Sequence, residues 1–396
     1  MRRLSPRHQV YVTRIGYFLC GFAVACWAPL IPLIQDHLQL STEAVSFMVL
    51  AFGIGSVSGM FISGFLLQWI GFKTTYAISC FTTSVSICIL ALMPGYETVL
   101  AALIVFGISI GCLEVVINVF AAYIEKKYRI MMMSVLFGYY SMGEVVGAVL
   151  MMLLLTISLS PAVAIVSLIS ITWLASAWYI PAIISIKSED KKENRTFVMP
   201  RQPVISLALI IAFTYMVGGA VLDWSGLYVT GAADIPLNLA SFGYCIVAAC
   251  MLLCRLYSRA VINVIGPFNF AFYGALLMIA AMVCMVQFPN VYVLTISFIV
   301  LGVGMSNISP LVTSATGAQT AMPLVPAISF LSVCGYSGLL LGPALLGFIA
   351  SSFSLGGIFL FLSALTALSA AFIYSCRAQF NAIDPRHNRT GADRPA

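Results

Sequence analysis

"KSEDKKENRT", residues Lys187 to Thr196, is the one long polar interruption in a chain that is apolar almost from end to end. The chain has 396 residues, of which 61% are hydrophobic and only 8% are charged, and its mean hydropathy is +1.05. Soluble domains carry about 25% charged residues. The composition therefore predicts an integral membrane protein that the polar segment divides into two parts.

The apolar runs on both sides of this segment are long enough to cross a bilayer, since a helix needs about 20 apolar residues to span roughly 30 Å of hydrocarbon. We predict an all-α membrane protein with six spans on each side, at 11–35, 43–68, 76–93, 98–123, 131–157, 161–186, 203–231, 238–258, 267–288, 291–317, 326–352 and 355–375. The predicted organisation is an N-terminal bundle, a cytoplasmic linker loop, a C-terminal bundle and a cytoplasmic tail, at 1–186, 187–202, 203–376 and 377–396.

The distribution of positive charge predicts the orientation of the spans. Lys and Arg are retained in the short loops on the cytoplasmic side of a membrane. In this chain they occupy both ends, the polar segment and the loops after the second, fourth and eighth predicted spans, whereas the alternate loops contain acids but no Lys or Arg. Both termini are therefore predicted to be cytoplasmic.

The two halves of the chain carry an internal repeat. One offset of 195 residues aligns glycines from several spans: Gly71 with Gly266, Gly107 with Gly302, Gly143 with Gly338 and Gly147 with Gly342. The same offset aligns Gln68 with Asn263. A single offset that matches several spans predicts two pseudo-symmetric parallel repeats, related by an axis along the membrane normal.

Motifs for catalysis, metal binding and cofactor binding are absent from the sequence. The 11 cysteines lie in or beside apolar runs without a CxxC pair, and the 3 histidines lie in terminal or loop segments. Buried cysteine packs as a small apolar residue. No nucleotide-binding loop, hydrolytic triad or zinc-ligand cluster occurs. We therefore expect no enzyme activity, no metal, no cofactor and no nucleic-acid partner.

Three acidic residues fall deep within predicted spans. Glu114 lies about 15 Å from the cytoplasmic end of its span, Glu144 about 20 Å from that edge, and Asp223 roughly 16 Å inside the periplasmic edge. An isolated carboxylate at the bilayer centre costs about 2.5–3.5 kcal/mol on insertion scales, so such a residue normally faces a cavity or a partner.

Removal from water disfavours the charged form of a carboxyl group, and a second carboxyl nearby disfavours it further. That is the physical requirement for proton exchange at physiological pH, and we predict that Glu114, Glu144 and Asp223 are proton-coupling residues. The alternative is a permanently protonated acid with a structural role.

Polar and aromatic side chains at similar depth are candidates for solute binding. Asn118 lies one helical turn from Glu114 on the same face and is predicted to hydrogen-bond the solute. The other candidates are Trp27, Tyr140, Trp224, Asn307 and Tyr336. Tryptophan often anchors a helix at the membrane interface, and polar groups also join helices, so these alternatives stay open. Arg255, four residues from Arg259, is expected to extend its charge to the cytoplasmic interface.

The segment between the second and third predicted spans resembles the loop motif of the major facilitator superfamily, which runs Gly, three residues, Asp, a basic residue, one residue, Gly and then basic residues. The matching positions here are Gly64, Gln68, Trp69, Gly71 and Lys73. Gln68 replaces the usual Asp, and Trp69 replaces the usual basic residue. The resemblance implies a conformational latch at Gly64, Gln68, Gly71 and Lys73, with the amide of Asn263 as a counterpart in place of an ion pair.

Within that superfamily, "CLEVVIN" (Cys112 to Asn118) and "YYSMG" (Tyr139 to Gly143) resemble the fourth and fifth spans of the fucose-permease branch. The branch has an Asp shortly before an Ile-Pro in its first span, where this chain has "CWAPLIP" (Cys26 to Pro32). This departure argues against fucose as the substrate. The overall pattern is similar to uncharacterised bacterial inner-membrane proteins of the branch, which implies a multi-pass protein of that membrane.

The resemblance implies a secondary active transporter of a small polar solute that works by alternating access. Proton symport is the favoured coupling, since the fifth span lacks the Gly-Pro signature of the drug antiporters. The alternatives are a drug or metabolite efflux antiporter of the same fold and a transporter-like receptor without flux. The expected partners are the solute, protons and the lipid bilayer, and the protein is expected to be a monomer. Few bases occur in the spans, which favours a neutral or cationic solute.

Overall fold

The computed structural model describes residues 6–27, 30–157, 159–179, 199–232 and 242–386. These residues form α-helices joined by short connections, and no strand occurs among them. The polar segment Lys187–Thr196 lies outside the described residues. The chain divides into two compact units, one comprising Met1–Ile124, Leu136–Met199 and Ile328–Phe330, and the other comprising Glu125–Val135, Pro200–Ala327 and Leu331–Ala396.

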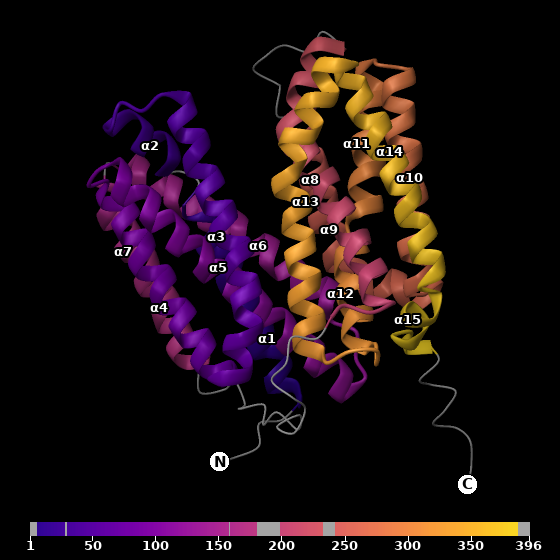
Figure 1. Cartoon of the computed structure of the whole chain (residues 1–396), viewed down its shortest axis with the longest axis horizontal. Coiled ribbons are helices and arrows are strands. Elements are labelled where there is room, and N and C mark those ends of the chain that lie inside the picture. The colour runs from indigo at the N-terminus through magenta and orange to yellow at the C-terminus, as the bar shows by residue number, and fades with distance from the viewer. Residues whose placement is uncertain (1–5, 28–29, 158, 180–198, 233–241, 387–396) are drawn as a thin grey trace. The chain divides into compact units, whose positions relative to one another are not determined.

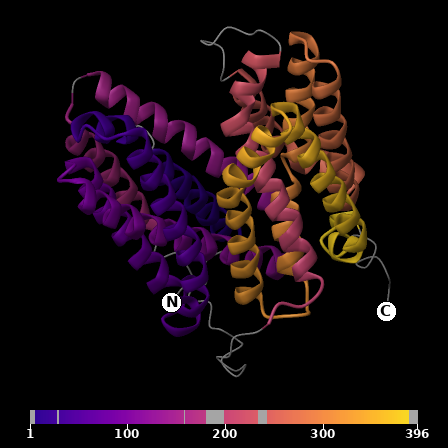
Figure 2. The same cartoon turned by 45° about the horizontal axis from the view of Figure 1, so that its top comes forward.

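The first unit contains seven of the helices, and α5 among them is long and mostly buried. Figures 1 and 2 show its helices in indigo to magenta. They are α1 (Pro6–Ala25), α2 (Leu30–His37), α3 (Thr42–Trp69), α4 (Gly71–Leu92), α5 (Tyr96–Tyr128), α6 (Met133–Thr156) and α7 (Pro161–Tyr179).

The second unit contains the helices that Figure 1 draws in rose to yellow. They are α8 (Val204–Ala232), α9 (Phe242–Ile265), α10 (Pro267–Gln287), α11 (Val291–Met305), α12 (Ile308–Ala318), α13 (Leu324–Ser352), α14 (Leu355–Ser375) and α15 (Arg377–Ala382). Helix α10 packs on α11 and α14, α14 packs on α8, and α9 packs on α11.

Ten helical segments of the described chain are long and apolar enough to span a membrane, with α11 and α12 counted as one segment, Val291–Ala318. Shorter apolar helices, Gln9–Ala25 and Pro161–Ser170, occupy the positions of the first and sixth predicted spans. The structure is therefore an all-helical, multi-pass arrangement, and the count of twelve spans stays a prediction.

Two predicted spans are each divided into two helices. The first predicted span corresponds to α1 and α2, and the tenth to α11 and α12. In each case a proline, Pro32 or Pro310, falls within the first turn of the second helix. Proline has no N–H, so within a continuous helix it leaves the carbonyl group four residues earlier without its partner, whereas the first turn of a helix tolerates proline well. A helix that restarts just before the proline thus avoids the cost of an interior proline.

The packing within the two units repeats along with the sequence. A Cβ on Gly107 would overlap the carbonyl oxygen of Phe52, and a Cβ on Gly302 would lie 2.9 Å from the carbonyl oxygen of Val247. Both glycines and both partners are separated by 195 residues, the offset that aligns the two halves. The close approach of α3 to α5 in the first unit thus recurs as that of α9 to α11 in the second, as expected of a duplicated bundle.

The turns between two helix pairs also repeat. Gly71 joins α3 to α4 with φ 78°, and Gly266 joins α9 to α10 with φ 82°. Glycine adopts this left-handed conformation without the steric cost that a Cβ imposes. The aligned glycines therefore serve the same short turn in both units.

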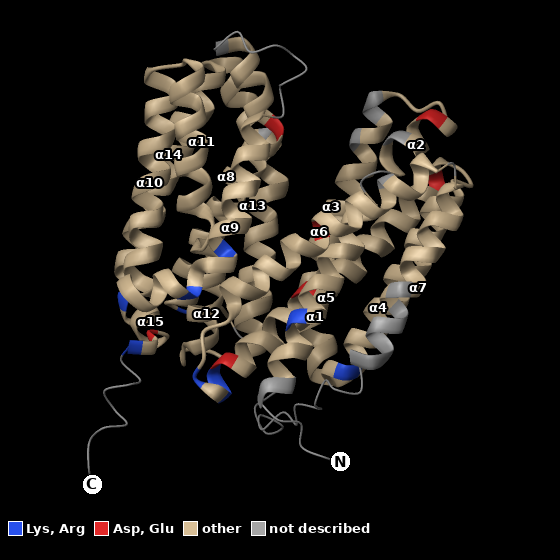
Figure 3. Ribbon diagram, turned by 180° about the vertical axis from the view of Figure 1, so that it is seen from behind, with Lys and Arg blue, Asp and Glu red and all other residues tan. Residues whose placement is uncertain are grey.

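Charged side chains are unevenly distributed in each unit. Figure 3 shows that most of the described Lys and Arg of a unit gather toward one end, drawn at the bottom of that view. Acidic residues occur at both ends and also within the helical layers. Each unit therefore has one end with the positive charge typical of a cytoplasmic face.

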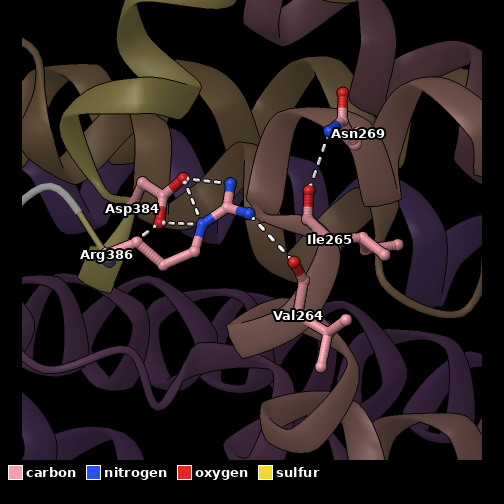
Figure 4. Close-up of polar contacts among 5 residues, drawn as sticks. All are labelled: Val264, Ile265, Asn269, Asp384 and Arg386. Carbon is pink, nitrogen blue, oxygen red and sulfur yellow. Dashed lines mark hydrogen bonds and ion pairs between the residues drawn. The ribbon is translucent and has the colours of Figure 1, made fainter.

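The residues after α15 are fastened to the turn between α9 and α10 (Figure 4). Arg386 forms an ion pair of 2.6 Å with Asp384, whose side chain is 1% exposed, and its Nη1 donates to the carbonyl oxygen of Val264 at 3.0 Å. The hydrogen bonds that its guanidinium donates to Asp384 raise the pKa of Arg386 above its ordinary value. The guanidinium therefore stays charged and holds this segment against the second unit.

Candidate functional site

Helix α5 presents two polar side chains on one face. Glu114 and Asn118 are half-buried, whereas every other residue from 109 to 122 is buried. Residues four apart on a helix lie on the same face, one turn from each other. In this stretch of α5, the face that is not fully buried is thus the one that carries the carboxyl group and the amide.

A hydrogen bond from α1 holds the amide of Asn118. The hydroxyl of Tyr17 donates to Oδ1 of Asn118 at 2.6 Å. Tyr17 is 1% exposed, and its ring lies 5.9 Å from the ring of Phe137 in α6. Packing fixes the tyrosine, and its hydroxyl fixes the amide oxygen, so the Nδ2 group of Asn118 points away from Tyr17.

The two predicted acids of the first unit share a neighbour. The buried thiol of Cys20 in α1 lies within electrostatic range of both Glu114 in α5 and Glu144 in α6. Glu144 is half-buried, like Glu114. The structure therefore brings the two glutamates around one side chain of α1.

A small cavity adjoins Cys20. Its volume is about 30 Å³, and its polar lining residues are Cys20, Tyr76, Cys80, Thr83, Ser84 and Thr172. The hydroxyl oxygen of Thr83 is buried without a hydrogen-bond partner. A polar cavity of this size has room for one water molecule.

The remaining candidates of the first unit differ in exposure. Trp27 is 6% exposed, and its ring packs against those of Phe52 and Phe106 with centroids 5.7 and 6.5 Å away. Tyr140 in α6 is half-buried, and its backbone carbonyl meets α1 at Gly21. Trp27 thus lies in an aromatic cluster, whereas Tyr140 lies one turn from Glu144.

In the second unit, Asp223 is exposed and Trp224 is half-buried in α8. The indole nitrogen of Trp224 is buried without a hydrogen-bond partner, and a Cβ on Gly347 of α13 would lie 3.7 Å from the indole ring. Tyr336 of α13 is half-buried with its ring 5.8 Å from that of Tyr215 in α8. Trp224 and Tyr336 therefore lie at the contact between α8 and α13, whereas Asp223 lies on the exposed surface of α8.

Asn307 and Arg255 both form hydrogen bonds with Ser306 at the break in the tenth span. Asn307 is 2% exposed, and its Nδ2 donates to Oγ of Ser306 at 2.9 Å. Nε of Arg255, the residue expected to extend its charge to the interface, donates to the carbonyl oxygen of Ser306 at 3.0 Å. The predicted end of this span at 258 was early. Helix α9 continues to Ile265, so Arg255 lies roughly 15 Å from its end.

The residues of the predicted latch lie at helix ends. In the first unit Gly64 is half-buried, Gln68 and Lys73 are exposed, and Gly71 forms the turn. In the second unit Asn263 is exposed and lines a cavity of about 240 Å³. The other polar residues that line this cavity are Arg129, Ser134, Ser258, Arg259 and Ser314.

Glu125 is a buried acid that the sequence analysis did not single out. It is 8% exposed, and its Oε1 accepts the backbone N–H groups of Met132 and Met133 at 2.6 and 2.7 Å. It therefore closes the connection from α5 to α6. A single acid before the basic run Lys126-Lys127 was the only sequence signal for it.

Comparisons with known proteins identify the fold and the family. Residues 14–323 match the family model described as Major Facilitator Superfamily. An uncharacterised MFS-type transporter of Yersinia pestis is 29% identical over 347 residues, which cover 88% of this chain and 90% of that protein.

Solved structures of two transporters are similar in fold. FucP in its outward conformation has a TM-score of 0.79 at 15% identity, covering 93% of this chain and 98% of that chain. A second structure of FucP, the E. coli fucose:proton symporter, has a TM-score of 0.74. The proton:xylose symporter XylE has a TM-score of 0.66 at 15% identity, covering 93% of this chain and 95% of that chain.

At such identities the solved structures show the fold alone, whereas the family model matches more than half of the chain. The protein is therefore a multi-pass membrane transporter of the Major Facilitator Superfamily and not an enzyme.

Proposed function

We propose that this transporter moves a small polar solute across the bacterial inner membrane by proton symport. The observation that carries the proposal is the pair Glu114 and Asn118, half-buried one turn apart in an otherwise buried stretch of α5. The fold neighbours FucP and XylE are described as proton symporters of sugars, which supports the same coupling here.

Glu114 is the proposed proton site. An ionised carboxylate only accepts hydrogen bonds, whereas a protonated carboxyl group also donates one. Protonation one turn from Asn118 therefore changes which groups of a solute the site accepts. Glu144, which shares the neighbour Cys20 with Glu114, is the second proposed proton site. Asp223 in α8 is the third proposed titrating group.

Asn118 is the proposed solute-binding residue. The hydrogen bond from Tyr17 uses the Oδ1 atom, and a solute acceptor such as a hydroxyl oxygen suits the Nδ2 donors. The further proposed solute contacts are Trp27, Tyr140, Trp224, Asn307 and Tyr336. A mixed set of amide and aromatic groups fits a small, polar and uncharged or cationic solute.

Alternating access is proposed to use the repeated bundles as the two moving parts. The duplicated helix contacts at Gly107 and Gly302 support this role, because each bundle keeps its own close packing while it moves. Gly64, Gln68, Gly71 and Lys73 of one repeat and Asn263 of the other are the proposed latch. We further propose a monomer with both termini in the cytoplasm.

The test begins with a thermal-shift screen of the purified protein against sugars, amines and nucleosides. Any stabilising compound is then used in uptake assays with reconstituted vesicles under an imposed proton gradient. We expect gradient-driven accumulation for the wild type. The Glu114→Gln variant is expected to lose it while it retains exchange of solute across the membrane, because Gln cannot titrate.

Glu97→Gln is the matched control, since Glu97 is an exposed acid in the first turn of the same helix. It is expected to behave like the wild type. A Glu114→Gln variant with the full proton dependence of the wild type would refute the coupling role. Accumulation driven by the opposite gradient would identify an antiporter, and binding without flux would identify a receptor.

A further inference from the structure

The tenth span lacks a backbone hydrogen bond at its break. In a continuous α-helix the N–H of residue 310 donates to the carbonyl oxygen of Ser306. Residue 310 is a proline and has no N–H to donate. The next bond is intact, since the N–H of Leu311 donates to the carbonyl oxygen of Asn307 at 3.0 Å. Pro310 therefore removes the helical partner of one specific carbonyl group.

A side chain of the neighbouring helix replaces that partner. Nε of Arg255 in α9 donates to the carbonyl oxygen of Ser306 at 3.0 Å. Ser306 is fully buried, with 0% of its surface exposed. A carbonyl group in such a place has no access to water, and leaving it without a donor is costly. The arginine thus satisfies the carbonyl that the proline leaves unpaired.

The same break fixes Asn307, one of the proposed solute contacts. Its Nδ2 donates to Oγ of Ser306, and that hydroxyl donates to the carbonyl oxygen of Val303 at 2.7 Å. The backbone carbonyl and the hydroxyl of Ser306 are therefore both held, one by Arg255 and the other by the end of α11. Any movement of Ser306 would shift the amide of Asn307.

We propose that Arg255 is a positioning residue of this transporter, which donates the hydrogen bond that Pro310 removes and thereby holds the tenth span at its break with Asn307 in place. The replacement of the missing Pro310 donor by Arg255 involves residues of the second unit alone. The consequence for transport rests on the proposed function.

Two matched substitutions test the donor. Arg255→Gln keeps an N–H donor, because the amide nitrogen of Gln is as many bonds from the backbone as Nε of Arg. Arg255→Met has a similar length and no donor. We expect the Met variant to lower the midpoint of thermal unfolding by several degrees and the Gln variant to stay near the wild type. Equal losses in both would overturn the proposal, since they would implicate the charge or the bulk of Arg255. Equal retention would overturn it as well.

A double-mutant cycle with Pro310→Ala tests the partner. Alanine restores the N–H of residue 310, so Ser306 no longer needs the arginine. We expect Arg255→Met to lower the unfolding midpoint in the wild-type background and to have little effect in the Pro310→Ala background. Arg259→Met, an exposed arginine one turn further along α9, is the control and should be neutral in both. A loss from Arg255→Met that is the same in both backgrounds overturns the proposal.

Uptake kinetics separate positioning from plain stability. With the solute found in the screen, we expect Arg255→Met to raise KM about tenfold at an unchanged level of folded protein, as expected for loss of one well-placed polar contact. Asn307→Ala should add little further loss in that background. Unchanged kinetics beside a lowered unfolding midpoint would reject the positioning role. If the wild type transports nothing, the proposed function fails, while the stability cycle still decides whether Arg255 replaces the donor.

Discussion

Single hydrogen bonds from neighbouring helices set the orientation of the polar side chains in this transporter. The hydroxyl of Tyr17 fixes the amide of Asn118, and Nε of Arg255 fixes the backbone next to Asn307. In each case a donor on one helix holds a candidate residue, or the backbone beside it, on another. The donors therefore matter to a solute that neither of them needs to contact.

The Tyr17→Phe substitution tests this for Asn118. Phenylalanine keeps the ring against Phe137 but removes the donor to Oδ1. We expect a loss of about 1 kcal/mol in the free energy of unfolding and a several-fold rise in the KM for the solute, because the freed amide can rotate. Thermal unfolding and uptake assays measure the two effects.

Tyr11→Phe is the matched control, because Tyr11 is a 62% exposed tyrosine of the same helix. It should leave both quantities near their wild-type values. If Tyr17→Phe is as neutral as the control, the hydroxyl does not orient Asn118.

At the scale of helices, close packing at glycine recurs in both units. Alanine in place of a helical glycine normally stabilises by about 0.5–1 kcal/mol. At Gly107 and Gly302 the added Cβ would meet the backbone carbonyl of the adjoining helix. The steric clash therefore opposes the gain in helix propensity. The clash is with backbone atoms, which cannot move aside as the end of a flexible side chain can.

We expect Gly107→Ala and Gly302→Ala each to destabilise the protein by about 1–3 kcal/mol, since overpacking forces the backbone to shift. Gly342→Ala is the control, because its Cβ would find its nearest neighbour, Cγ of Met216, at an ordinary 3.5 Å. The control should be neutral or stabilising. Thermal unfolding of the three variants decides the matter, and equal behaviour of all three would refute the duplicated contact.

At the scale of the whole chain, the segment after α15 closes onto a turn that lies far earlier in the sequence. The guanidinium of Arg386 donates three hydrogen bonds of 2.6 to 3.1 Å to Asp384 and one to the carbonyl oxygen of Val264. The side chain of Arg386 is 43% exposed, whereas that of Asp384 is 1% exposed. The exposed arginine thus neutralises a buried carboxylate.

Arg386→Ala leaves that carboxylate without its cation. We expect a destabilisation of about 1–3 kcal/mol, below the value of a fully buried pair because solvent screens the exposed partner. Asp384→Asn in the same background should recover part of the loss, because it removes the buried charge. Thermal unfolding of the single and double variants tests this, and a double variant no more stable than Arg386→Ala would contradict it.

The sequence predicted the class of the molecule, its repeat and the shared face of Glu114 and Asn118. These features follow from local properties: the length of an apolar run, the placement of charge between runs, and the helical period that puts residues 114 and 118 on one face. The offset of 195 residues also predicted the equivalent contacts of Gly107 and Gly302 and the equivalent turns at Gly71 and Gly266. The aligned pair Gly147 and Gly342 differs, since a Cβ on Gly147 would crowd the carbonyl oxygen of Phe22, whereas one on Gly342 would find ordinary space. Each of these patterns depends on residues that are near one another in the chain or on the repeat itself. They can therefore be read from the sequence before the fold is known.

Tertiary structure alone decided which polar groups meet. Tyr17 and Asn118 are 101 residues apart, Arg255 and Ser306 are 51 apart, and Arg386 and Val264 are 122 apart. The composition near Arg255 predicted a side chain that reaches the interface, but the packing of α9 against α11 placed it beside a carbonyl that Pro310 leaves unpaired. Each pairing depends on how two helices are rotated and aligned against each other, and no local pattern in one helix encodes that geometry.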